Sequence, residues 1–556
     1  QAPPLEVVDD DESSVTSNDS MPELKERNQS TQSSRSSVAS KSDGPAKSEP
    51  HVTFALEGET RDATITSDRD LNDDQSIVGA VLSFEAIDAN AMGEDLEESN
   101  ATEALKAAVY EEVDFETYVK ETCSHLKPEE QAQLLAVIRE HADLFRGVRG
   151  NWKGEPVDIK LIDGAKGTWA KPYPVPLKNR RVMEEELDRQ CEIGALRRLS
   201  AEEGEEEDRE FASPAFGVPK KNGTIRLVIN YQALNKMIKR REYPLPTLEE
   251  IFASIIGFTF ASSIDLNMGY LSIPLTERAK KLCTVITPFG LYEPQVLPMG
   301  VKPASDIFQA RMVEVFASMV AAERPNPYID DILHCRGDDF NAHLSILREI
   351  FRRLLEAGMQ VNLEKSSLAQ LELEFLGFLL GRSGIKPTVK RVEAILKVAP
   401  PTDVRGIRMF LGMINFIKNH CPNRASILAP ITNLTKKDVA FVWGEEQQKA
   451  FDEIKAVTAE SIMLVYPNPN LPYTVMPDAS SKYGMGAFLL QEQEGIEVTV
   501  STYSAKFNDA QLKYSVGRQE LLAAHSACRH FKPIIHGCEV KIRIDHKNWT
   551  FEGTQH

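Results

Sequence analysis

The spacing of apolar residues divides this chain into an irregular first part and a regular remainder. Over residues 1 to about 105, Ser, Asp, Glu, Asn and Thr dominate, and the few apolar residues follow no regular period. Such a segment buries too little apolar surface to offset the entropy of ordering its backbone. We therefore predict that residues 1–110 form a disordered tail.

From residue 111 onward, apolar residues recur with helical or strand spacing. Helices are predicted near residues 114–122 and from Pro128, where a proline in the first turn precedes apolar residues spaced three and four apart. A polar, proline-rich stretch over residues 150–176 is expected to be extended. A third helix is predicted over residues 178–197, followed by an acidic loop over residues 202–210.

Two strand runs, at residues 215–218 and 225–229, flank a segment with the composition of a hairpin turn. That segment reads Lys220-Lys221-Asn222-Gly223-Thr224. Its two lysines are either part of a solvated turn or a mobile basic tip that closes on phosphate groups with Arg226 as a partner. The residues alone leave both alternatives open.

Two adjacent carboxylates interrupt an apolar run later in the chain. Residues 327–333 read Pro-Tyr-Ile-Asp-Asp-Ile-Leu, and Asp is both depleted in strands and unfavourable in apolar surroundings without a partner. We therefore predict a hairpin turn formed by Asp330-Asp331, between strands that end at residues 328–329 and begin at residues 332–333. A turn alone explains the pattern, and so does a turn that presents carboxylates to divalent cations.

A third carboxylate lies near the end of another apolar strand. Residues 258–266 form that strand, and Asp265 precedes Asp330 by 65 residues. This separation is long enough for the two strands to be neighbours in one sheet. Between them, a loop rich in Pro and Gly over residues 297–305 leads into a predicted helix over residues 306–320.

The rest of the chain first has helical and then mixed spacing. Helices are predicted over residues 343–357, 389–398 and 404–419. The last part is predicted to be a small mixed domain whose strands and single helix follow in order: strands at residues 473–480, 484–491 and 498–504, a helix at 516–531 and a strand at 540–544.

Charge changes the interpretation of the first part only. The net charge of −19 argues, taken alone, against a nucleic acid partner. However, residues 1–110 hold 24 Asp and Glu against 8 Lys and Arg, whereas the remaining 446 residues hold 59 against 56. A nearly neutral body can display a basic groove, so the net charge does not exclude nucleic acid binding.

Length, cysteine content and hydropathy define the broad class. The 556 residues, of which 42% are hydrophobic, allow three or four packed domains. Seven Cys without a C-x-x-C pair indicate reduced thiols and no structural zinc. No apolar run reaches the roughly 18 residues needed to span a bilayer, and no signal pattern opens the chain. We therefore expect a soluble, intracellular protein. Because the first residue is Gln1 rather than Met, we also expect a fragment or a processed piece of a longer protein.

Short motifs follow one another in a fixed order from residue 218 onward. They are Val218-Pro219-Lys220-Lys221-Asn222-Gly223-Thr224-Ile225-Arg226, Tyr231-Gln232-Ala233-Leu234-Asn235-Lys236, Tyr243-Pro244-Leu245-Pro246, Ile264-Asp265-Leu266, Thr287-Pro288-Phe289-Gly290, Leu297-Pro298-Met299-Gly300, Ile307-Phe308-Gln309, Tyr328-Ile329-Asp330-Asp331, Phe375-Leu376-Gly377-Phe378 and Phe410-Leu411-Gly412-Met413-Ile414-Asn415-Phe416. The ordered set resembles the reverse transcriptases of gypsy-type long-terminal-repeat retrotransposons. The resemblance covers roughly residues 130 to 556 and leaves the acidic tail unexplained.

The resemblance implies an α+β multidomain fold, with the fingers, palm and thumb of a right-hand polymerase, a connection and a ribonuclease H-like mixed α/β domain. It divides the chain into a disordered acidic tail (1–110), a helical lead-in (111–165), fingers and palm (166–380), thumb and connection (381–465) and a ribonuclease H-like domain (466–556). A retroelement particle in the cytoplasm, or the nucleus, is the implied location.

The resemblance also implies nucleotidyl transfer from a deoxynucleoside triphosphate to a primer 3′-hydroxyl. In this chemistry two Mg²⁺ or Mn²⁺ ions roughly 4 Å apart activate the hydroxyl and stabilise the leaving pyrophosphate. The implied catalytic and metal-binding residues are Asp265, Asp330 and Asp331, with the peptide carbonyl of Leu266 as a further ligand. The implied partners are an RNA or DNA template-primer duplex and deoxynucleoside triphosphates.

Five further positions acquire a nucleotide-binding role from their place in the motifs. Lys220 or Lys221 and Arg226 would hold the triphosphate. Met299 and Gly300 would line the nucleotide pocket. These roles are implied by the resemblance and not by spacing or composition.

The resemblance also implies roles at the sugar, the leaving group and the primer end. Tyr270 would pack against the sugar and exclude a 2′-hydroxyl, although an ordinary core aromatic is the alternative. Lys365 would protonate the leaving pyrophosphate, although a solvated surface lysine is the alternative. Phe375, Leu376 and Gly377 are similar to the turn that grips the primer end.

A second two-metal site is implied in the last domain, where Asp478, Glu520 and Asp545 would hydrolyse RNA in an RNA–DNA hybrid. Two features depart from the family pattern. Pro477 lies inside the strand and lacks a ladder donor, and the sequence stops at His556, before the last strand, the last helix and a fourth carboxylate. We therefore expect an incomplete domain with weak or no hybrid cleavage.

Two functional classes remain open. One is an RNA-directed DNA polymerase with an attached ribonuclease H region. The other is an inactive or co-opted relic that binds nucleic acid without turnover, which Gln232 favours because the family usually has Arg there. An acidic interaction scaffold explains only residues 1–110. No Asp-Thr/Ser-Gly protease signature and no zinc-binding integrase pattern occurs in the sequence.

Overall fold

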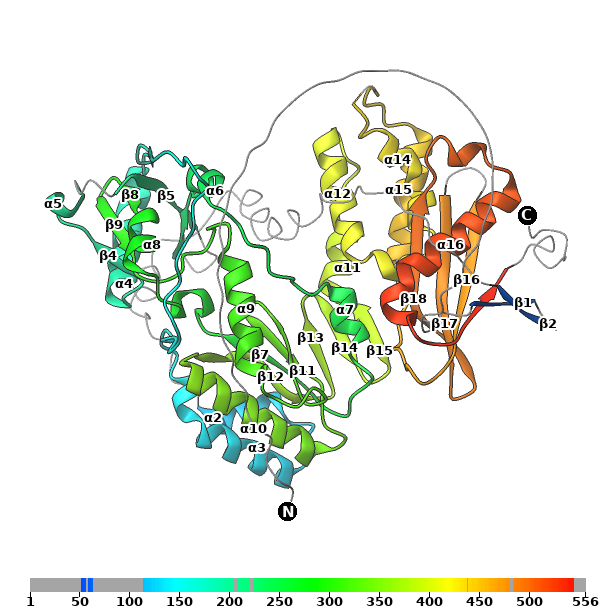
Figure 1. Cartoon of the computed structure of the whole chain (residues 1–556), viewed down its shortest axis with the longest axis horizontal. Coiled ribbons are helices and arrows are strands. Elements are labelled where there is room, and N and C mark those ends of the chain that lie inside the picture. The colour runs from blue at the N-terminus through cyan, green and yellow to red at the C-terminus, as the bar shows by residue number, and fades with distance from the viewer. Residues whose placement is uncertain are drawn as a thin grey trace, which may run out of the picture. The chain divides into compact units, whose positions relative to one another are not determined.

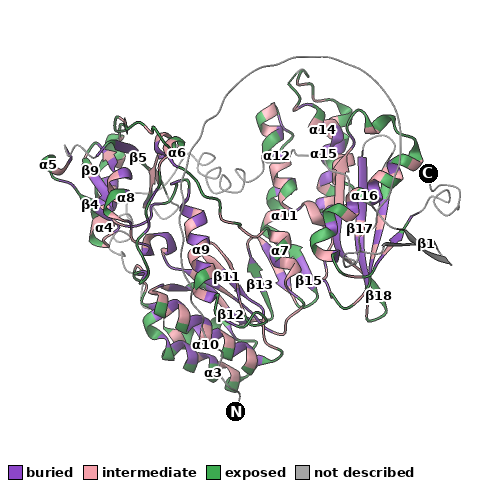
Figure 2. Cartoon of the chain, viewed as in Figure 1, coloured by how far each residue is buried: buried purple, intermediate pink, exposed green. Residues whose placement is uncertain are grey.

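The strands that the computed structural model describes form four sheets, and helices pack against them (Figure 1). The structure describes residues 52–56, 59–63, 114–204, 209–219, 224–437, 439–480 and 484–544. Buried positions gather on the strands and on the inner faces of the helices (Figure 2). No helix within the described ranges is long and apolar enough to cross a membrane.

The first described helices confirm two predictions. Asp114 caps the first of them by accepting hydrogen bonds from the N–H groups of Glu116 and Thr117. Pro128 is the first residue of the second helix, where its missing N–H costs no hydrogen bond. Both helices share the largest apolar core with a later helix. The elements are α2 (Phe115–Thr122), α3 (Pro128–Glu140), η4 (Ala142–Phe145) and the later α10 (Phe340–Ala357).

A six-stranded sheet follows, in the order β3-β5-β8-β9-β4 with β6 paired to β5. Its strands are β3 (Thr168–Trp169), β4 (Leu196–Arg198), β5 (Phe211–Pro219), β6 (Ile225–Ile229), β8 (Val285–Thr287) and β9 (Gly290–Pro294). The helices of this part of the chain are α4 (Leu177–Glu192), α5 (Ala201–Gly204), α6 (Gln232–Met237), α7 (Leu248–Ala253) and α8 (Glu277–Leu282).

Two sequence expectations in this sheet need correction. The helix predicted over residues 178–197 ends at Glu192, because Gly194 adopts a φ of +70° and the next residues pair with β9 as strand β4. The predicted acidic loop begins with the short helix α5, and residues 205–208 lie outside the described residues.

A four-stranded sheet, ordered β10-β11-β7-β12, holds the predicted carboxylates. Helix α9 begins two residues before the predicted residue 306, directly after Pro303, and ends at Phe316 rather than residue 320. Just beyond this end, the Arg324 guanidinium donates hydrogen bonds to the backbone carbonyls of Ala317 and Met319. The elements are β7 (Ala261–Leu266), η5 (Gly269–Ser272), α9 (Ala304–Phe316), β10 (Asn326–Tyr328), β11 (Asp331–His334) and β12 (Val361–Gln370).

A three-stranded sheet and a helical region follow and share a second apolar core. The helix predicted over residues 404–419 ends at Phe416, and a 3-10 turn continues the chain. The elements are β13 (Glu372–Phe375), β14 (Phe378–Gly381), β15 (Gly384–Pro387), α11 (Val389–Leu396), α12 (Val404–Phe416), η6 (Lys418–His420), α13 (Arg424–Ile427), α14 (Ala429–Asn433) and α15 (Glu445–Ala459).

The last sheet has the order β18-β17-β16-β19-β1-β2, and α16 packs against β16 and β17. Strand β17 is almost wholly buried (Figure 2). The elements agree with the predicted mixed domain and are β16 (Tyr473–Ser480), β17 (Gly484–Gln493), β18 (Ile496–Lys506), η7 (Gln511–Lys513), α16 (Val516–Ile535) and β19 (Val540–Arg543).

Two strands fall within the segment predicted to be disordered. They are β1 (Val52–Leu56) and β2 (Glu59–Ala63), and β1 pairs in parallel with β19. The residues of β1 read Val-Thr-Phe-Ala-Leu, a β-prone composition that the averaged character of the tail concealed. The other residues of that segment lie outside the described residues.

Candidate active site

Strands β10 and β11 form a hairpin whose turn carries the paired carboxylates. Tyr328 pairs with Asp331, so the turn consists of Ile329 and Asp330. The predicted turn of Asp330-Asp331 is therefore wrong by one residue, and the reason is that Asp331 also pairs with Asp265 of β7. Ile329 has a φ of 54°, which is unusual for a β-branched residue and which glycine favours at the first position of a tight hairpin turn.

Helix α9 braces this strained turn. Gln309 is 1% exposed, and its Oε1 accepts a hydrogen bond from the Ile329 N–H over 2.7 Å. Its Nε2 donates to the Pro327 carbonyl over 2.8 Å. Gln309 belongs to the motif Ile307-Phe308-Gln309, and the sequence alone predicted no role for it. A glutamine at a buried helical position was the available signal, because a buried amide must find partners.

Strand β7 brings the third carboxylate to the same place. Asp265 lies directly opposite Asp331 in the antiparallel pairing of β7 with β11, so both side chains lie on one face of the sheet. The Leu266 N–H donates to the Asp330 carbonyl over 3.0 Å and ties β7 to the turn. The prediction that these two strands are neighbours is confirmed.

The three carboxyl groups carry more negative charge than their surroundings neutralise. Among the described residues, no donor reaches the buried Asp330 Oδ1. Burial, and then repulsion from Asp331 and Asp265, raise the pKa of Asp330 to about 7. Burial and repulsion from Asp265 raise the pKa of Asp331 to about 6, and burial raises the pKa of Asp265. Such a set of groups favours a bound cation near neutral pH.

The metal-free protein is expected to lose stability as the pH rises through this site. A carboxyl whose pKa is higher in the folded than in the unfolded chain binds its proton more tightly when folded, so stability falls as the pH rises from about 4 to about 7. Thermal unfolding in EDTA should show the Tm of the wild type falling relative to that of Asp330→Asn across this interval. A Tm difference that does not change with pH would contradict this expectation.

The donor set suits a hard divalent cation, although its side chains do not enclose one as they lie. Carboxylate oxygens are the ligands that Mg²⁺ and Mn²⁺ prefer, and Asp330 Oδ1 is a ligand position without a partner. However, the described residues contain no group of three or more acidic, His or Cys side chains spaced to hold a metal ion. The predicted ligand set of Asp265, Leu266, Asp330 and Asp331 is therefore not tested by this arrangement. The two-metal site stays a prediction.

Lys365 lies near all three carboxylates on the adjacent strand β12. Its ammonium group lowers the pKa of Asp265, Asp330 and Asp331 against the stronger effect of burial. The lysine is exposed, and its backbone N–H donates to Asn362 Oδ1 over 3.2 Å. The residue is therefore both solvated and beside the carboxylates, and its proton-donor role stays a prediction.

Tyr270 follows β7 and stands beside the hairpin turn. The residue is 8% exposed, and its ring stacks on Phe308 with centroids 4.8 Å apart. Its hydroxyl donates to Ser305 Oγ over 3.1 Å. The preceding residue, Gly269, approaches the turn so closely that a Cβ there would lie 2.5 Å from Asp330 Oδ1. Tyr270 is thus part of the wall around Asp330 and also of the core.

The predicted nucleotide-binding residues are only partly described. Lys220 and Lys221 lie outside the described residues. Arg226 is exposed on β6, in register with Val218 of β5. Met299 and Gly300 are exposed in the loop before α9, and the Asn235 side chain holds that loop by donating to the Gly300 carbonyl over 2.9 Å.

The predicted primer-grip segment is a tight hairpin turn between β13 and β14. Phe375 pairs with Phe378, and the turn residues Leu376 and Gly377 have φ values of 49° and 83°, the pattern of a type I′ turn. A Cβ at Gly377 would lie 2.3 Å from Arg391 Nε. The Arg391 guanidinium in turn lies 3.9 Å from the centroid of the Phe416 ring. The turn therefore contacts helices α11 and α12 through Arg391.

Gly377→Ala is expected to lower the free energy of unfolding by about 1–3 kcal/mol and to shorten primer-extension products. The positive φ strains any residue with a Cβ, and the new methyl group displaces Arg391 from Phe416. Gly537→Ala is the matched control, because Gly537 has a φ of 84° and open space around its Cβ position. If both variants lose the same stability and keep product length, Arg391 does not couple the turn to the helices.

The residues predicted for the second site are on β16 and α16. Asp478 is exposed on β16 and Glu520 is half-buried on α16, which packs against that strand, whereas Asp545 lies outside the described residues. Strand β16 continues through Pro477, which is in register with Ala487 of β17. Within the described part of the chain, the pairing of β16 with β19 covers Tyr473–Val475, so Pro477 lies beyond it.

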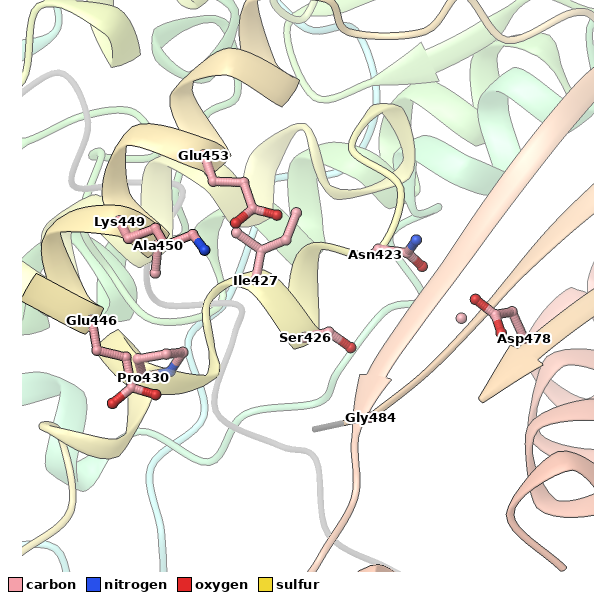
Figure 3. Close-up of a pocket in the computed structure, with 11 residues that line it drawn as sticks. Asn423, Ser426, Ile427, Pro430, Glu446, Lys449, Ala450, Glu453, Asp478 and Gly484 are labelled. Atoms are coloured by element: carbon pink, nitrogen blue, oxygen red, sulfur yellow. The ribbon is translucent and has the colours of Figure 1, made fainter. Parts of the chain in front are cut away.

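A cavity of about 380 Å³ lies beside Asp478. Figure 3 shows the Asp478 carboxylate and the Asn423 side chain among the residues that line it. The cavity does not include Glu520. Its lining residues are Asn423, Ser426, Ile427, Pro430, Glu446, Lys449, Ala450, Glu453, Asp478, Gly484 and Gly486.

Comparison with known protein families assigns both regions. The family described as "Reverse transcriptase (RNA-dependent DNA polymerase)" matches residues 218–380, which include the hairpin and β7. The family described as "RNase H-like domain found in reverse transcriptase" matches residues 443–542. The chain contains a reverse transcriptase domain and a ribonuclease H-like domain.

The sequence relatives of this chain are transposon polyproteins. The Transposon Tf2-3 and Tf2-7 polyproteins of Schizosaccharomyces pombe are each 28% identical to it, over 404 and 400 residues, and each match covers 71% of the chain. The predicted resemblance to gypsy-type retrotransposon polyproteins is confirmed. The chain spans 29% of the length of these relatives.

Solved structures confirm the predicted fold class. A foamy viral protease-reverse transcriptase in complex with dsDNA matches this chain with a TM-score of 0.69 and 22% sequence identity. The match covers 79% of this chain and 90% of the viral chain. The same viral protein in complex with RNA/DNA hybrid has a TM-score of 0.67, over 78% of this chain and 57% of that one. At such identities the likeness shows the fold alone.

Proposed function

We propose that this chain is an RNA-directed DNA polymerase that adds nucleotides by a two-metal mechanism. The observation that carries the proposal is the convergence of Asp265, Asp330 and Asp331, from a strand and a hairpin, with an unpartnered oxygen on Asp330. Bound Mg²⁺ or Mn²⁺ ions supply Lewis acidity at the primer hydroxyl and the triphosphate. The raised pKa of each carboxyl supports this role, because a cation offsets the charge that burial disfavours.

The protein side chains orient the reactants around that centre. Asp265 and Asp331 hold ligand oxygens on one face of the sheet, and Asp330 presents its Oδ1 from the turn. Lys365 is the nearby cation that we assign to the leaving pyrophosphate, on the basis of its effect on all three carboxyls. Arg226 and the loop at Met299 and Gly300 are assigned to the incoming nucleotide.

A nucleic acid duplex is the proposed partner, and helix α12 offers a surface for it. Arg405, Arg408 and Met409 are exposed on one helical face, because residues three and four apart share a face. A Cβ at Gly412, further along that face, would meet no atom within 4 Å. Two arginines beside an open, shallow surface suit phosphate contacts that guide a duplex without reading its sequence.

Weak cleavage of RNA in an RNA–DNA hybrid is the proposed activity of the second domain, in line with the expectation from the sequence. Asp478 on β16 and Glu520 on α16 are the described candidates, and Asp545 is assigned on the motif alone. The support is that Asp478 and Glu520 lie within residues 443–542, which the family match covers, whereas Asp545 lies beyond that match. Hybrid cleavage that is unchanged in Asp478→Asn would contradict this assignment.

Primer extension on an RNA template tests the polymerase proposal. The full chain should extend a DNA primer with deoxynucleoside triphosphates in Mg²⁺ or Mn²⁺, stop when EDTA is added and resume when the ion is restored. Template-primer binding, measured in parallel by fluorescence anisotropy, separates loss of chemistry from loss of binding. Tight binding without incorporation in either ion would contradict the proposal and support a nucleic-acid-binding relic.

A further inference from the structure

One helix, α9, holds both the tyrosine beside the active site and the turn that carries Asp330. Its first turn bears Ser305, whose Oγ accepts a hydrogen bond from the Tyr270 hydroxyl over 3.1 Å. Its next turn bears Phe308, which stacks on Tyr270 at an interplanar angle of 25°. Gln309 then hydrogen-bonds to both sides of the hairpin turn. A displacement of α9 therefore moves Tyr270 and Asp330 together.

The first turn of α9 is itself fixed by an ion pair between the buried Asp306 and the exposed Arg240. Asp306 is 2% exposed and accepts hydrogen bonds from Arg240 Nε over 2.6 Å and Arg240 Nη2 over 3.0 Å. The Tyr243 N–H adds a third hydrogen bond to the same carboxylate over 3.2 Å. Charge-assisted, bidentate contacts of this kind have narrow geometry. Ser305 is therefore presented to Tyr270 from a rigid position.

The Tyr270 hydroxyl is suited to act as a donor to Ser305. Burial raises the pKa of Tyr270 to about 12, so the hydroxyl keeps its proton at neutral pH. The ring is held at two points, at its tip by Ser305 and across its face by Phe308. Loss of the tip contact leaves stacking alone, which tolerates sliding of the ring more readily than a hydrogen bond does.

We propose that Ser305 is a positioning residue for sugar selection, which holds the Tyr270 ring where it excludes a ribose 2′-hydroxyl. This inference rests on the proposed polymerase function and on the role assigned to Tyr270. It adds a second residue, Ser305, which determines how strongly the Tyr270 ring discriminates against ribonucleotides. A ring free to shift admits ribonucleotides more often, while insertion of deoxynucleotides changes little.

Single-nucleotide insertion by the full chain tests this inference. On an RNA template with a DNA primer and Mg²⁺, kcat/KM is measured for deoxyadenosine and adenosine triphosphate opposite the same template base. Ser305→Ala should lower the ratio of the two values by about two- to tenfold, the effect of one neutral hydrogen bond. Tyr270→Phe should lower the ratio equally, and the double variant no further, because both changes remove the same contact.

Control variants separate positioning from general damage. Ser305→Thr keeps a hydroxyl and should keep the ratio near that of the wild type. Glu314→Gln changes an exposed residue of α9 whose ion pair is with Arg311, and it should leave the ratio unchanged. A merely structural loss in Ser305→Ala would lower both kcat/KM values by the same factor, and this result would overturn the inference.

Tyr270→Ala distinguishes failure of the inference from failure of the proposed function. If Tyr270→Ala abolishes sugar discrimination but Ser305→Ala and Tyr270→Phe keep it, the inference is wrong and the role of Tyr270 stands. If Tyr270→Ala also keeps discrimination, the assigned role of Tyr270 is wrong and the inference falls with it. If the wild-type chain inserts neither nucleotide, the polymerase proposal fails and the inference is overturned as well.

Discussion

Asp330→Asn is expected to reduce nucleotide addition by more than about a thousandfold while template-primer affinity changes by less than about threefold. A metal ligand that stabilises transition-state charge contributes several kcal/mol, and each 1.36 kcal/mol corresponds to a tenfold change in rate. Asparagine keeps the shape of the side chain but removes the charge that the unpartnered Oδ1 contributes. The fold should persist, because the hairpin is held by backbone pairing and by Gln309.

Pre-steady-state primer extension with a single nucleotide measures this effect directly. Asp338→Asn is the matched control, since it removes an exposed carboxylate just beyond β11 and should leave the rate unchanged. Anisotropy with a labelled duplex checks binding, and thermal unfolding checks the fold. Polymerisation by Asp330→Asn within tenfold of the wild type would show that the reaction centre lies elsewhere.

The sequence predicted two features around the active site: the bounds of one strand and the adjacency of the two strands that carry the carboxylates. The strand at residues 225–229 has the predicted bounds as β6, because its β-branched composition and flanking turn signals are local. The neighbouring positions of β7 and β11 followed from the two carboxylate-bearing strands and their separation. The turn was predicted one residue too late, because its position depends on the pairing of Asp331 with Asp265, a contact between residues far apart in the sequence.

Contacts between distant residues account for what sequence reasoning missed. Gln309 meets Ile329 across 20 residues, Ser305 meets Tyr270 across 35, and Asp306 meets Arg240 across 66. In the sequence alone, Ser305, Asp306 and Gln309 are ordinary polar residues near the start of a predicted helix. Only folding shows that they are buried or half-buried and directed at one site. The roles of Lys220, Lys221 and Asp545 remain predictions, since these residues lie outside the described residues.

The close packing around Gly269 leads to the second prediction with a large expected effect. Gly269→Ala should abolish most nucleotide addition and lower the free energy of unfolding by about 1–3 kcal/mol, as overpacking of a buried site typically does. The new Cβ would lie 2.5 Å from Asp330 Oδ1 and 2.7 Å from Phe308 Cζ. Neither neighbour can yield easily, because Asp330 belongs to a braced turn and Phe308 is stacked on Tyr270.

The same substitution in open surroundings provides the control. Gly517→Ala adds a methyl group in the first turn of α16, where no atom lies within 4 Å of the Cβ position, and it should leave polymerisation unchanged. Primer extension and thermal unfolding of both variants give the comparison. If Gly269→Ala retains activity, the Asp330 carboxylate moves without loss of function, and the position of Oδ1 seen here is not the one that the reaction requires. If activity is lost while the free energy of unfolding falls by no more than about 1–3 kcal/mol, the protein stays folded and the methyl group acts on the carboxylate itself. The close approach of Gly269 to Oδ1 leads us to expect this outcome.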